Sequence, residues 1–424
     1  MLAFFFTLGK IAERMKVWIK YLIGIILGII IAIVAGKDNE SFFQTTQFLT
    51  DLALQIGRYA IYPILFFGFA LGIYNLAETK RLGKVLIFCF CFAILSAFLF
   101  SGLGITSFFI MNPSRIPILV ENATALPQFS FSSFLLATFP SSPFSSFTES
   151  LFLLPICFFA FCIGLSAASI EKSFAKHALT IFDSFARIAY SMLTFFVDFY
   201  AIFLTIISIQ WFVQLRTIFE MGFFTDIIIL LLVDLVILFC GVYPLIIKLI
   251  CKEANPFKVL YASLATFLCA ITTTDSNVTL VTNLRHCHES LGIRRRISNV
   301  ATPLLTIFAK PGSALVLSVS FLVIFKSYSN HSMGVKSLLL LLLLSSVFSL
   351  VLSQFSIGGT YIALATICLF FGSAYEQGYL ILKPMAFFLG AIATAIDAFA
   401  AMVGSYILAY QTDMALEKDL RFFI

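Results

Sequence analysis

The sequence predicts an all-α polytopic membrane protein with eight transmembrane helices and two re-entrant helical hairpins. Its composition points there first, because 61% of the 424 residues are hydrophobic, 11% are charged and the mean hydropathy is +1.04. Apolar runs long enough to cross a bilayer recur along the chain. In the C-terminal half, two further apolar segments break near their middle. A soluble domain does not combine these features.

Eight apolar runs are candidates for spanning helices. In chain order they cover 17–36, 48–74, 85–111, 151–168, 178–213, 222–250, 295–328 and 380–412. Basic residues flank the first run and fill the link AETKRLGK at 77–84. Because cytoplasmic loops of membrane proteins collect Lys and Arg, we expect the amino terminus and this link to face the cytoplasm, and likewise the carboxyl terminus. The first residues are expected to form an interfacial lead-in and not a removable signal.

The order of elements after residue 255 is hairpin, interrupted helix, hairpin, charged helix. An apolar segment too short for a full crossing ends at TTTDSN and returns to a basic turn, which predicts a first hairpin over 255–290. A helix over 295–328 is interrupted at AKPGS, and a second hairpin is expected over 335–373 with its tip at SQFSIGGTY. A last helix covers 378–416. Paired broken segments indicate an inverted-repeat secondary transporter with its site near the midplane.

Lys310 stands in the middle of the interrupted helix, where an ionisable side chain costs at least about 2.5–3.5 kcal/mol and marks a functional site by default. A carboxylate would hold it in the charged form, and Asp275 at the first hairpin tip and Asp397 in the last helix are the expected partners. Three interpretations stay open. The ammonium group replaces a bound cation, Lys310 and its partner form a proton site, or Lys310 extends into a water-filled cavity and binds nothing in particular.

The hairpin tips supply hydroxyl, amide and backbone N–H groups, and helix N-termini aimed at a midplane cavity favour a carboxylate. Ser313 and Thr306 are expected to line the same space. Asp275 is unfavourable beside an anionic substrate unless Lys310 neutralises it or it binds an amine. The candidate substrate-binding residues at the tips and in the two charged helices are Thr274, Asp275, Ser276, Asn277, Ser313, Ser356, Gly358, Gly359, Thr360 and Asp397.

Other classes of function lack their usual motifs. The pair His286 and His288 lies in a basic turn with Glu289, which is typical of a solvated cytoplasmic loop and not of a zinc site. The sequence contains no H-E-x-x-H, G-x-S-x-G or phosphate-binding loop motif, so we expect no enzyme activity, cofactor or metal. The nine scattered cysteines are expected to pack as small apolar residues, and the net charge of +6 requires no nucleic-acid partner.

Seven stretches in the correct order resemble the dicarboxylate/amino acid:cation symporter family, which is also the glutamate transporter family. Among them are SPFSSFTESLFLLPICFFAFCIGLS, TDSNVTLVTN, TPLLTIFAKPGSA and SIGGTYIALA. The resemblance covers nearly the whole chain and implies a homotrimer in a bacterial inner membrane that carries a small-molecule substrate by an elevator mechanism. It also implies a fixed scaffold domain at 1–76 and 112–221 and a mobile transport domain at 77–111 and 222–424.

The chain departs from this family where the family binds cations and substrate. The family's Asn and Asp in the interrupted helix give oxygens to sodium, and here those positions are Ala309 and Pro311, whose side chains offer none. Of the polar residues that the resemblance implies along the last helix, only Asp397 is kept. The positions implied for the substrate amine, the substrate side-chain carboxylate and sodium are occupied by Ala401, Gly404, Leu408 and Thr412.

Asp413 is a candidate to replace the family's last acid in cation binding, together with Lys310, Asp275 and Asp397. It is one residue out of register with that acid, and one residue turns a helical side chain by about 100°. On the third helix Phe92 and Leu95 replace a Tyr and a Thr that bind sodium in the family, and Ser96 keeps its hydroxyl. We therefore expect a symporter-like secondary transporter of a small organic solute, such as an amino acid or a carboxylate, without the family's sodium coupling. The alternatives are an uncoupled facilitator or anion-conducting pathway, and a sensor or degenerate paralogue that does not transport.

Overall fold

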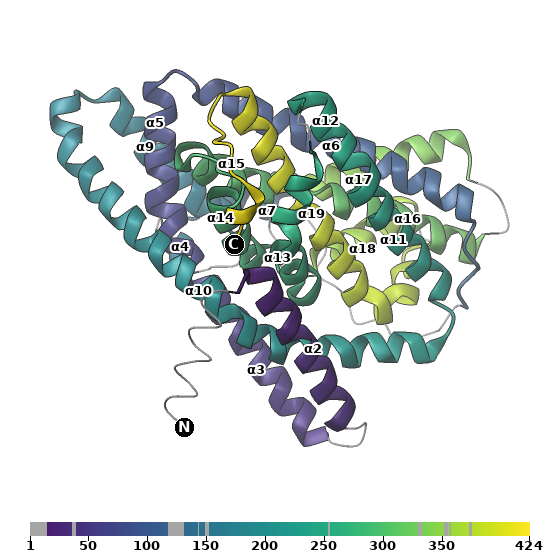
Figure 1. Cartoon of the computed structure of the whole chain (residues 1–424). Coiled ribbons are helices and arrows are strands. Elements are labelled where there is room, and N and C mark those ends of the chain that lie inside the picture. Colours follow the sequence, from purple (N-terminus) through teal and green to yellow (C-terminus); the bar gives the residue numbers. More distant parts are fainter. Residues whose placement is uncertain are drawn as a thin grey trace, which may run out of the picture.

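The fold consists of long helices that pack side by side around a buried centre (Figure 1). The computed structural model of the chain describes residues 15–35, 40–117, 131–142, 144–148, 152–252, 255–329, 333–351, 355, 358–372 and 375–424. Throughout these residues the regular elements are helices, apart from one isolated antiparallel bridge between Ile293 and Ala415. The predicted all-α class is confirmed.

Seven helices within the described residues are long and apolar enough to cross a membrane, which supports the predicted polytopic character. They cover 17–35, 41–78, 82–111, 172–221, 225–251, 295–328 and 378–411. The predicted span at 151–168 corresponds to α9 (Leu154–Ser169), whose 16 residues make it shorter than these seven. Length and composition thus support seven of the eight predicted transmembrane helices as membrane spans.

The first helices form a bundle with one very long helix. α2 (Val17–Ala35) and α3 (Glu40–Tyr59) both pack along α10 (Lys172–Met221), as Figure 1 shows. Gly24 and Gly28 make this possible, because a Cβ atom at either position would collide with backbone oxygens of α10. Their spacing of four residues is the small-residue pattern that brings membrane helices into close contact.

Short helices continue the second span, and the short helix α9 packs against it. α4 (Ile61–Pro63), η1 (Ile64–Gly68) and α5 (Phe69–Glu78) follow α3 directly. α9 packs against α5 at Gly164, where a Cβ atom would meet the backbone of α5. The remaining short helices of this region are α7 (Phe131–Thr138) and α8 (Ser145–Thr148).

Both predicted hairpins have helical arms in the structure. The first consists of α13 (Phe257–Thr273) and α14 (Ser276–Glu289), which pack on each other. The second consists of α17 (Val335–Val351) and α18 (Gly359–Phe370), and most of the turn between them lies outside the described residues. No arm reaches the length of the seven spanning helices, so their lengths agree with the prediction that each pair enters and leaves the bilayer on one side.

The interrupted helix forms the centre of the molecule. It consists of α15 (Arg295–Phe308) and α16 (Pro311–Tyr328). In its most apolar 18-residue stretch 94% of the residues are buried, compared with 78% in the corresponding stretch of the next most buried span. α16 packs against α6 (Leu82–Met111), α17, α18 and α19 (Ala386–Gln411). The other elements here are α11 (Thr225–Ile237), η2 (Leu238–Val242), α12 (Tyr243–Cys251), η4 (Gly378–Met385) and η5 (Leu420–Phe422).

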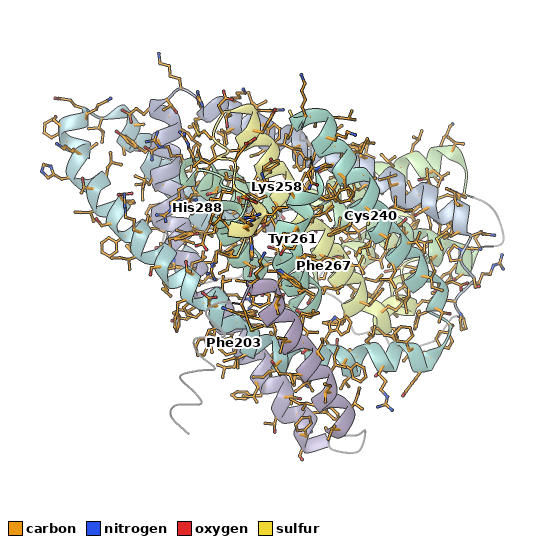
Figure 2. All side chains as sticks on the ribbon, in the orientation of Figure 1. Phe203, Cys240, Lys258, Tyr261, Phe267 and His288 are labelled. Atoms are coloured by element: carbon orange, nitrogen blue, oxygen red, sulfur yellow. The ribbon has the colours of Figure 1, made fainter. Side chains whose placement is uncertain are left out.

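The cysteines form no disulfide. All nine are free thiols, six of them buried, as expected of packing residues. Three are exposed, among them Cys240 in η2, which Figure 2 labels. The prediction of apolar packing thus holds for the buried six, while the exposed three lie on outward faces of the helices.

Candidate functional site

The break between α15 and α16 creates a helix N-terminus inside the protein. α15 ends at Phe308, and α16 begins at Pro311, which has no backbone N–H to leave unpaired and is favoured at the first position of a helix. Lys310 therefore occupies the N-cap position with a non-helical backbone (φ −117°, ψ 53°). The first N–H groups of α16 point toward a partner that the helix itself does not supply.

Asp397 is that partner. Its carboxylate accepts hydrogen bonds from the backbone N–H of Gly312 (2.7 Å), from that of Ser313 (3.2 Å) and from the Ser313 hydroxyl (2.7 Å). Gly312 has no room for a side chain, because a Cβ atom there would lie 2.5 Å from the Cβ atom of Ile396. A buried carboxylate at a helix N-terminus is stabilised by these donors and by the helix dipole.

Lys310 lies between two carboxylates and is fixed by neither. Its side chain is buried, with 5% of the residue exposed. Among the described residues its ammonium group forms no hydrogen bond or ion pair, yet both Asp397 and Asp275 are near enough to act on it electrostatically. The predicted charge partners are thus close by, but the contact is electrostatic and not a direct bond.

Asp275 has a different direct partner, which the sequence analysis did not identify. The Nε atom of Arg58, near the end of α3, lies 2.6 Å from the Asp275 Oδ2 atom, and Asp275 is completely buried. The Asp275 Oδ1 atom accepts from the backbone N–H of Asn277 (2.8 Å) and so caps α14. A signal for Arg58 was present, since it is the only arginine inside the predicted apolar span 48–74.

We call Arg58, Asp275, Lys310 and Asp397 the central charge cluster. It contains two positive and two negative side chains, so its formal charge is zero when all four are ionised. The four come from α3, the first hairpin tip, the break in the central helix and α19. A buried group with balanced charges tolerates the low dielectric of the interior far better than any of its members alone.

Several buried hydroxyl groups on these and neighbouring elements have no hydrogen-bond partner among the described residues, and three of them bear on the site. They belong to Thr306 on α15, Tyr243 on α12 and Tyr200 on α10. Tyr243 is electrostatically coupled to Asp397, and Tyr200 to Asp275 and Arg58. Since buried polar groups in native proteins are nearly always paired, these hydroxyls mark places where a water molecule or solute is expected.

The other residues of the first hairpin tip lie beside the cluster. Thr274 has a left-handed backbone (φ 53°), and its carbonyl accepts from the Thr394 hydroxyl of α19 at 3.4 Å. Ser276 and Asn277 form the first turn of α14. The tip is therefore attached to α19 one helical turn from Asp397.

The second tip is described only in part. Gly358 has a left-handed backbone (φ 71°), and Gly359 and Thr360 are buried at the start of α18, which packs on α16 and α19. Ser356, a predicted site residue, lies outside the described residues.

The predicted positions further along α19 have no polar role in the structure. Ala401 and Gly404 are buried among apolar side chains, and a Cβ atom at Gly404 would lie 2.9 Å from both Phe92 of α6 and Leu305 of α15. The surface that would face a substrate carboxylate is therefore closed by packing.

Asp413 does not belong to the central charge cluster. It is exposed beyond the end of α19, with a left-handed backbone (φ 54°), roughly 20 Å along the helix from Asp397. Its role as a substitute acid for cation binding stays a prediction from the sequence.

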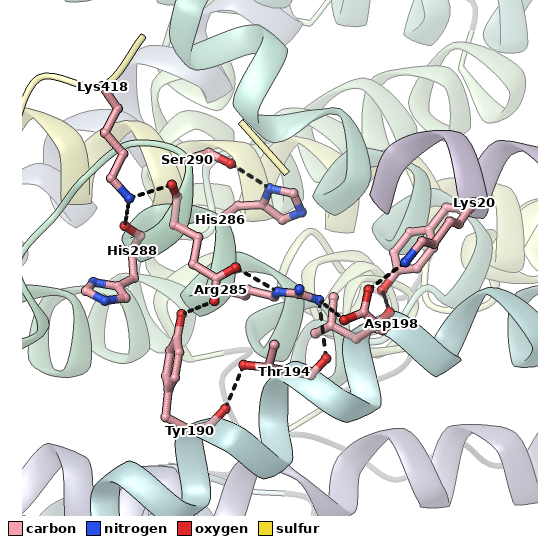
Figure 3. Close-up of polar contacts among 12 residues, drawn as sticks. Lys20, Tyr190, Thr194, Asp198, Arg285, His286, His288, Ser290 and Lys418 are labelled. Carbon is pink, nitrogen blue, oxygen red and sulfur yellow. Dashed lines mark hydrogen bonds and ion pairs between the residues drawn. The ribbon is translucent and has the colours of Figure 1, made fainter. Parts of the chain in front are cut away.

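The predicted basic turn begins inside α14 and is more buried than predicted. His286 is 1% exposed and its Nδ1 atom lies 3.3 Å from the Ser290 hydroxyl, so it does not belong to a solvated loop (Figure 3). The Nδ1 atom of His288 lies 3.0 Å from the Ile293 carbonyl oxygen. In the part of the chain that the structure describes, no group of three His, Cys, Asp or Glu side chains is arranged for a metal ion.

Comparisons with known proteins identify the family of the chain. Comparison with curated proteins gives no match. The sodium:dicarboxylate symporter family matches residues 17–411, which include all four members of the central charge cluster. This family consists of cation-coupled membrane transporters of dicarboxylates or amino acids. Because the match covers most of the chain, the protein belongs to the sodium:dicarboxylate symporter family.

Proposed function

We propose that the protein is a secondary transporter of a small organic solute in which the Lys310 ammonium group takes the place of a bound sodium ion. The observation that carries this proposal is the position of Lys310, which is buried at the break in the central helix within electrostatic reach of Asp275 and Asp397. A sodium site at this break needs several oxygen ligands, and the neighbouring side chains of Ala309 and Pro311 have none. Because the ammonium group is covalently attached to the protein, it acts as a tethered cation and removes the need for a mobile sodium ion.

We further propose the division into a scaffold at 1–76 and 112–221 and a transport domain at 77–111 and 222–424, within a homotrimer that works as an elevator. Family membership supports this division. The packing of α10 on α2 and α3, and of α6 on α16 and α17, is consistent with it. Under this proposal Arg58 is stationary, while Asp275, Lys310 and Asp397 move together.

The separation of Arg58 from Asp275 then limits the class of substrate. The moving part would carry two carboxylates and one ammonium group, a formal charge of −1, as soon as Asp275 leaves Arg58. An uncompensated buried charge is strongly unfavourable, so a cationic group must replace the guanidinium. We propose that the amino group of the solute supplies it, which favours amino acids over dicarboxylates.

The proposal is tested by a ligand screen followed by uptake into proteoliposomes. The purified protein is first screened by thermal stability against amino acids and dicarboxylates, and the stabilising compound is then used as a labelled substrate. Lys310→Met should abolish uptake, because two carboxylates lose their only moving counter-charge. Lys326→Met is the matched control, since Lys326 lies on the same helix but bonds Asn112 and Pro113 outside the cluster. Full activity of Lys310→Met would contradict the proposal.

A proton-coupled mechanism is the second candidate, because Lys310 and Asp397 form a buried pair of opposite charges at the site. Uptake driven by an imposed pH gradient supports it. The same vesicles separate the remaining alternatives: equilibration without accumulation indicates a facilitator or an anion-conducting pathway, and ligand binding without flux indicates a sensor or degenerate paralogue.

We also propose that the protein resides in a bacterial inner membrane with both termini in the cytoplasm. The seven apolar helices and the basic residues at Lys16, Lys20 and 77–84 support this orientation. Labelling of single cysteines introduced at Lys80 and Lys418 from either side of the membrane tests it. Labelling of both from the cytoplasmic side is expected.

A further inference from the structure

A cavity of about 830 Å³ lies away from the central charge cluster, between α2, α10, α14 and the chain after α19. We call residues 412–424 the tail. The walls of the cavity combine basic and apolar side chains, including Lys16 and Ile23 of α2, Phe199 and Ile202 of α10, and Arg421 of the tail. A molecule bound in this cavity would therefore contact both positively charged and apolar side chains.

The innermost charges of this cavity are balanced by one another (Figure 3). Asp198 of α10 accepts from the Lys20 ammonium group at 2.7 Å and forms an ion pair with Arg285 of α14 at 3.0 Å. Arg285 also forms an ion pair with Glu289 at 3.1 Å. Two basic and two acidic side chains thus compensate each other, and this part of the wall has no excess charge.

Lys16 and Arg421 give the cavity an excess of positive charge. Neither forms an ion pair with an acidic side chain among the described residues. Lys16 donates a hydrogen bond to the Tyr261 hydroxyl at 2.8 Å, a neutral partner that leaves its charge uncompensated. The side chain of Arg421 is exposed on η5 of the tail and also lines the cavity. Within the part of the chain that the structure describes, the cavity therefore carries two positive charges without an ion-pair partner.

The surroundings place this excess charge at the level of a membrane surface. Lys16 directly precedes α2 and Trp18 lies in its first turn, and α2 is long enough to span a bilayer. The ring of Trp18 packs edge-on against that of Tyr261 on α13, with ring centroids 6.3 Å apart, and Figure 2 labels Tyr261. Trp and Tyr gather where hydrocarbon meets water. Phe199 and Ile202 are 49% and 55% exposed, so an apolar surface continues from the charged end along α10.

We propose that this cavity binds an anionic phospholipid, with its phosphate held by Lys16 and Arg421 and its acyl chains along the apolar surface of α2 and α10. Basic pockets between membrane helices on the cytoplasmic side recognise anionic head groups in this way. A free phosphate would satisfy the charges but leave the apolar surface of Phe199 and Ile202 uncovered, and a zwitterionic lipid would cover that surface but bring no net charge. The proposal is independent of the transported solute.

The experiment uses the full chain purified in a neutral detergent. Its thermal unfolding temperature is titrated with phosphatidylglycerol, with phosphatidylcholine of the same chain length and with inorganic phosphate. Phosphatidylglycerol should raise the unfolding temperature in a saturable manner, and the other two should not. The double variant Lys16→Gln/Arg421→Gln should require roughly tenfold more phosphatidylglycerol for the same effect.

Lys176→Gln is the matched control, because Lys176 is an exposed lysine of α10 outside the cavity. It should titrate like the wild type. Native mass spectrometry of lipid retained by each single variant provides a second readout if the double variant is unstable without lipid. An equal response to phosphatidylcholine, an equal response to inorganic phosphate, or an unchanged titration of variants that fold normally would each overturn the proposal.

Discussion

Lys310 shows how a helix break accommodates a lysine inside a membrane protein. The helix break removes it from the regular backbone, and Pro311 starts the next helix without an unpaired N–H group. Asp397 is held in place by donors from Gly312 and Ser313, so its negative charge stays near Lys310 even without a direct ion pair. The lysine thus depends on a carboxylate that the backbone itself positions.

Removal of either charge alone should destabilise the protein more than removal of both. Asp397→Asn leaves Lys310 with one distant carboxylate, and the loss of a partner from a buried pair costs about 3–5 kcal/mol. The double variant Lys310→Met/Asp397→Asn should recover about 1–3 kcal/mol of the summed loss. Unfolding of the four proteins of this cycle in detergent measures the coupling, and strictly additive effects would show that the two residues do not interact.

Arg58 makes a second prediction at this scale. Arg58→Leu leaves the completely buried Asp275 without its ion-pair partner, so we expect a loss of about 3 kcal/mol in the free energy of unfolding. The double variant Arg58→Leu/Asp275→Leu should be closer to the wild type, because it leaves no uncompensated charge. If Arg58→Leu were as stable as the wild type, the bridge would have no structural importance.

At the scale of elements, close approach of helices depends on a few glycines. α2 contacts α10 where Gly24 and Gly28 leave no space for a side chain, and α6 contacts α16 in the same way at Gly104. These contacts set the distance between neighbouring helices, and in lipid such packing replaces the hydrophobic driving force that is absent there. The contact at Gly104 positions α16, whose N-cap residue is Lys310.

Gly28→Ala should therefore destabilise the protein by about 1–3 kcal/mol through overpacking against Thr205. Gly83→Ala is the matched control, since the same change on α6 meets no atom within 4 Å and should be neutral or stabilising. The thermal unfolding temperatures of both variants, compared with the wild type, measure this difference in stability. Equal effects of the two substitutions would mean that the approach of α2 to α10 does not limit stability.

At the scale of the whole molecule, hydropathy and the spacing of breaks were enough to predict the helices, both hairpins and the exceptional position of Lys310. The pairing of Arg58 with Asp275 was not predictable, because the two residues are 217 positions apart and no local pattern connects them. The burial of His286 was missed for a similar reason. The burial of His286 depends on how α14 packs in the folded molecule, whereas the local sequence is basic and typical of a loop.

The site positions that the family resemblance implies could be predicted only by comparing the chain with the family's motifs. The loss of polar groups at Ala401 and Gly404 followed from the aligned motif, and the packing of Phe92 and Leu305 against Gly404 supplies the physical reason. Asp413 lies just beyond α19, which ends at Gln411, a boundary that apolar periodicity does not define to the residue.

Sodium dependence of uptake by the wild-type protein tests the central claim most directly. Proteoliposomes are prepared with the substrate found in the stability screen, and initial uptake is measured with an inward sodium gradient and with choline in place of sodium at equal ionic strength. A tethered cation predicts the same rate in both, because Lys310 already occupies the position of the ion. Uptake that requires sodium and accumulates substrate in proportion to its gradient would contradict the account.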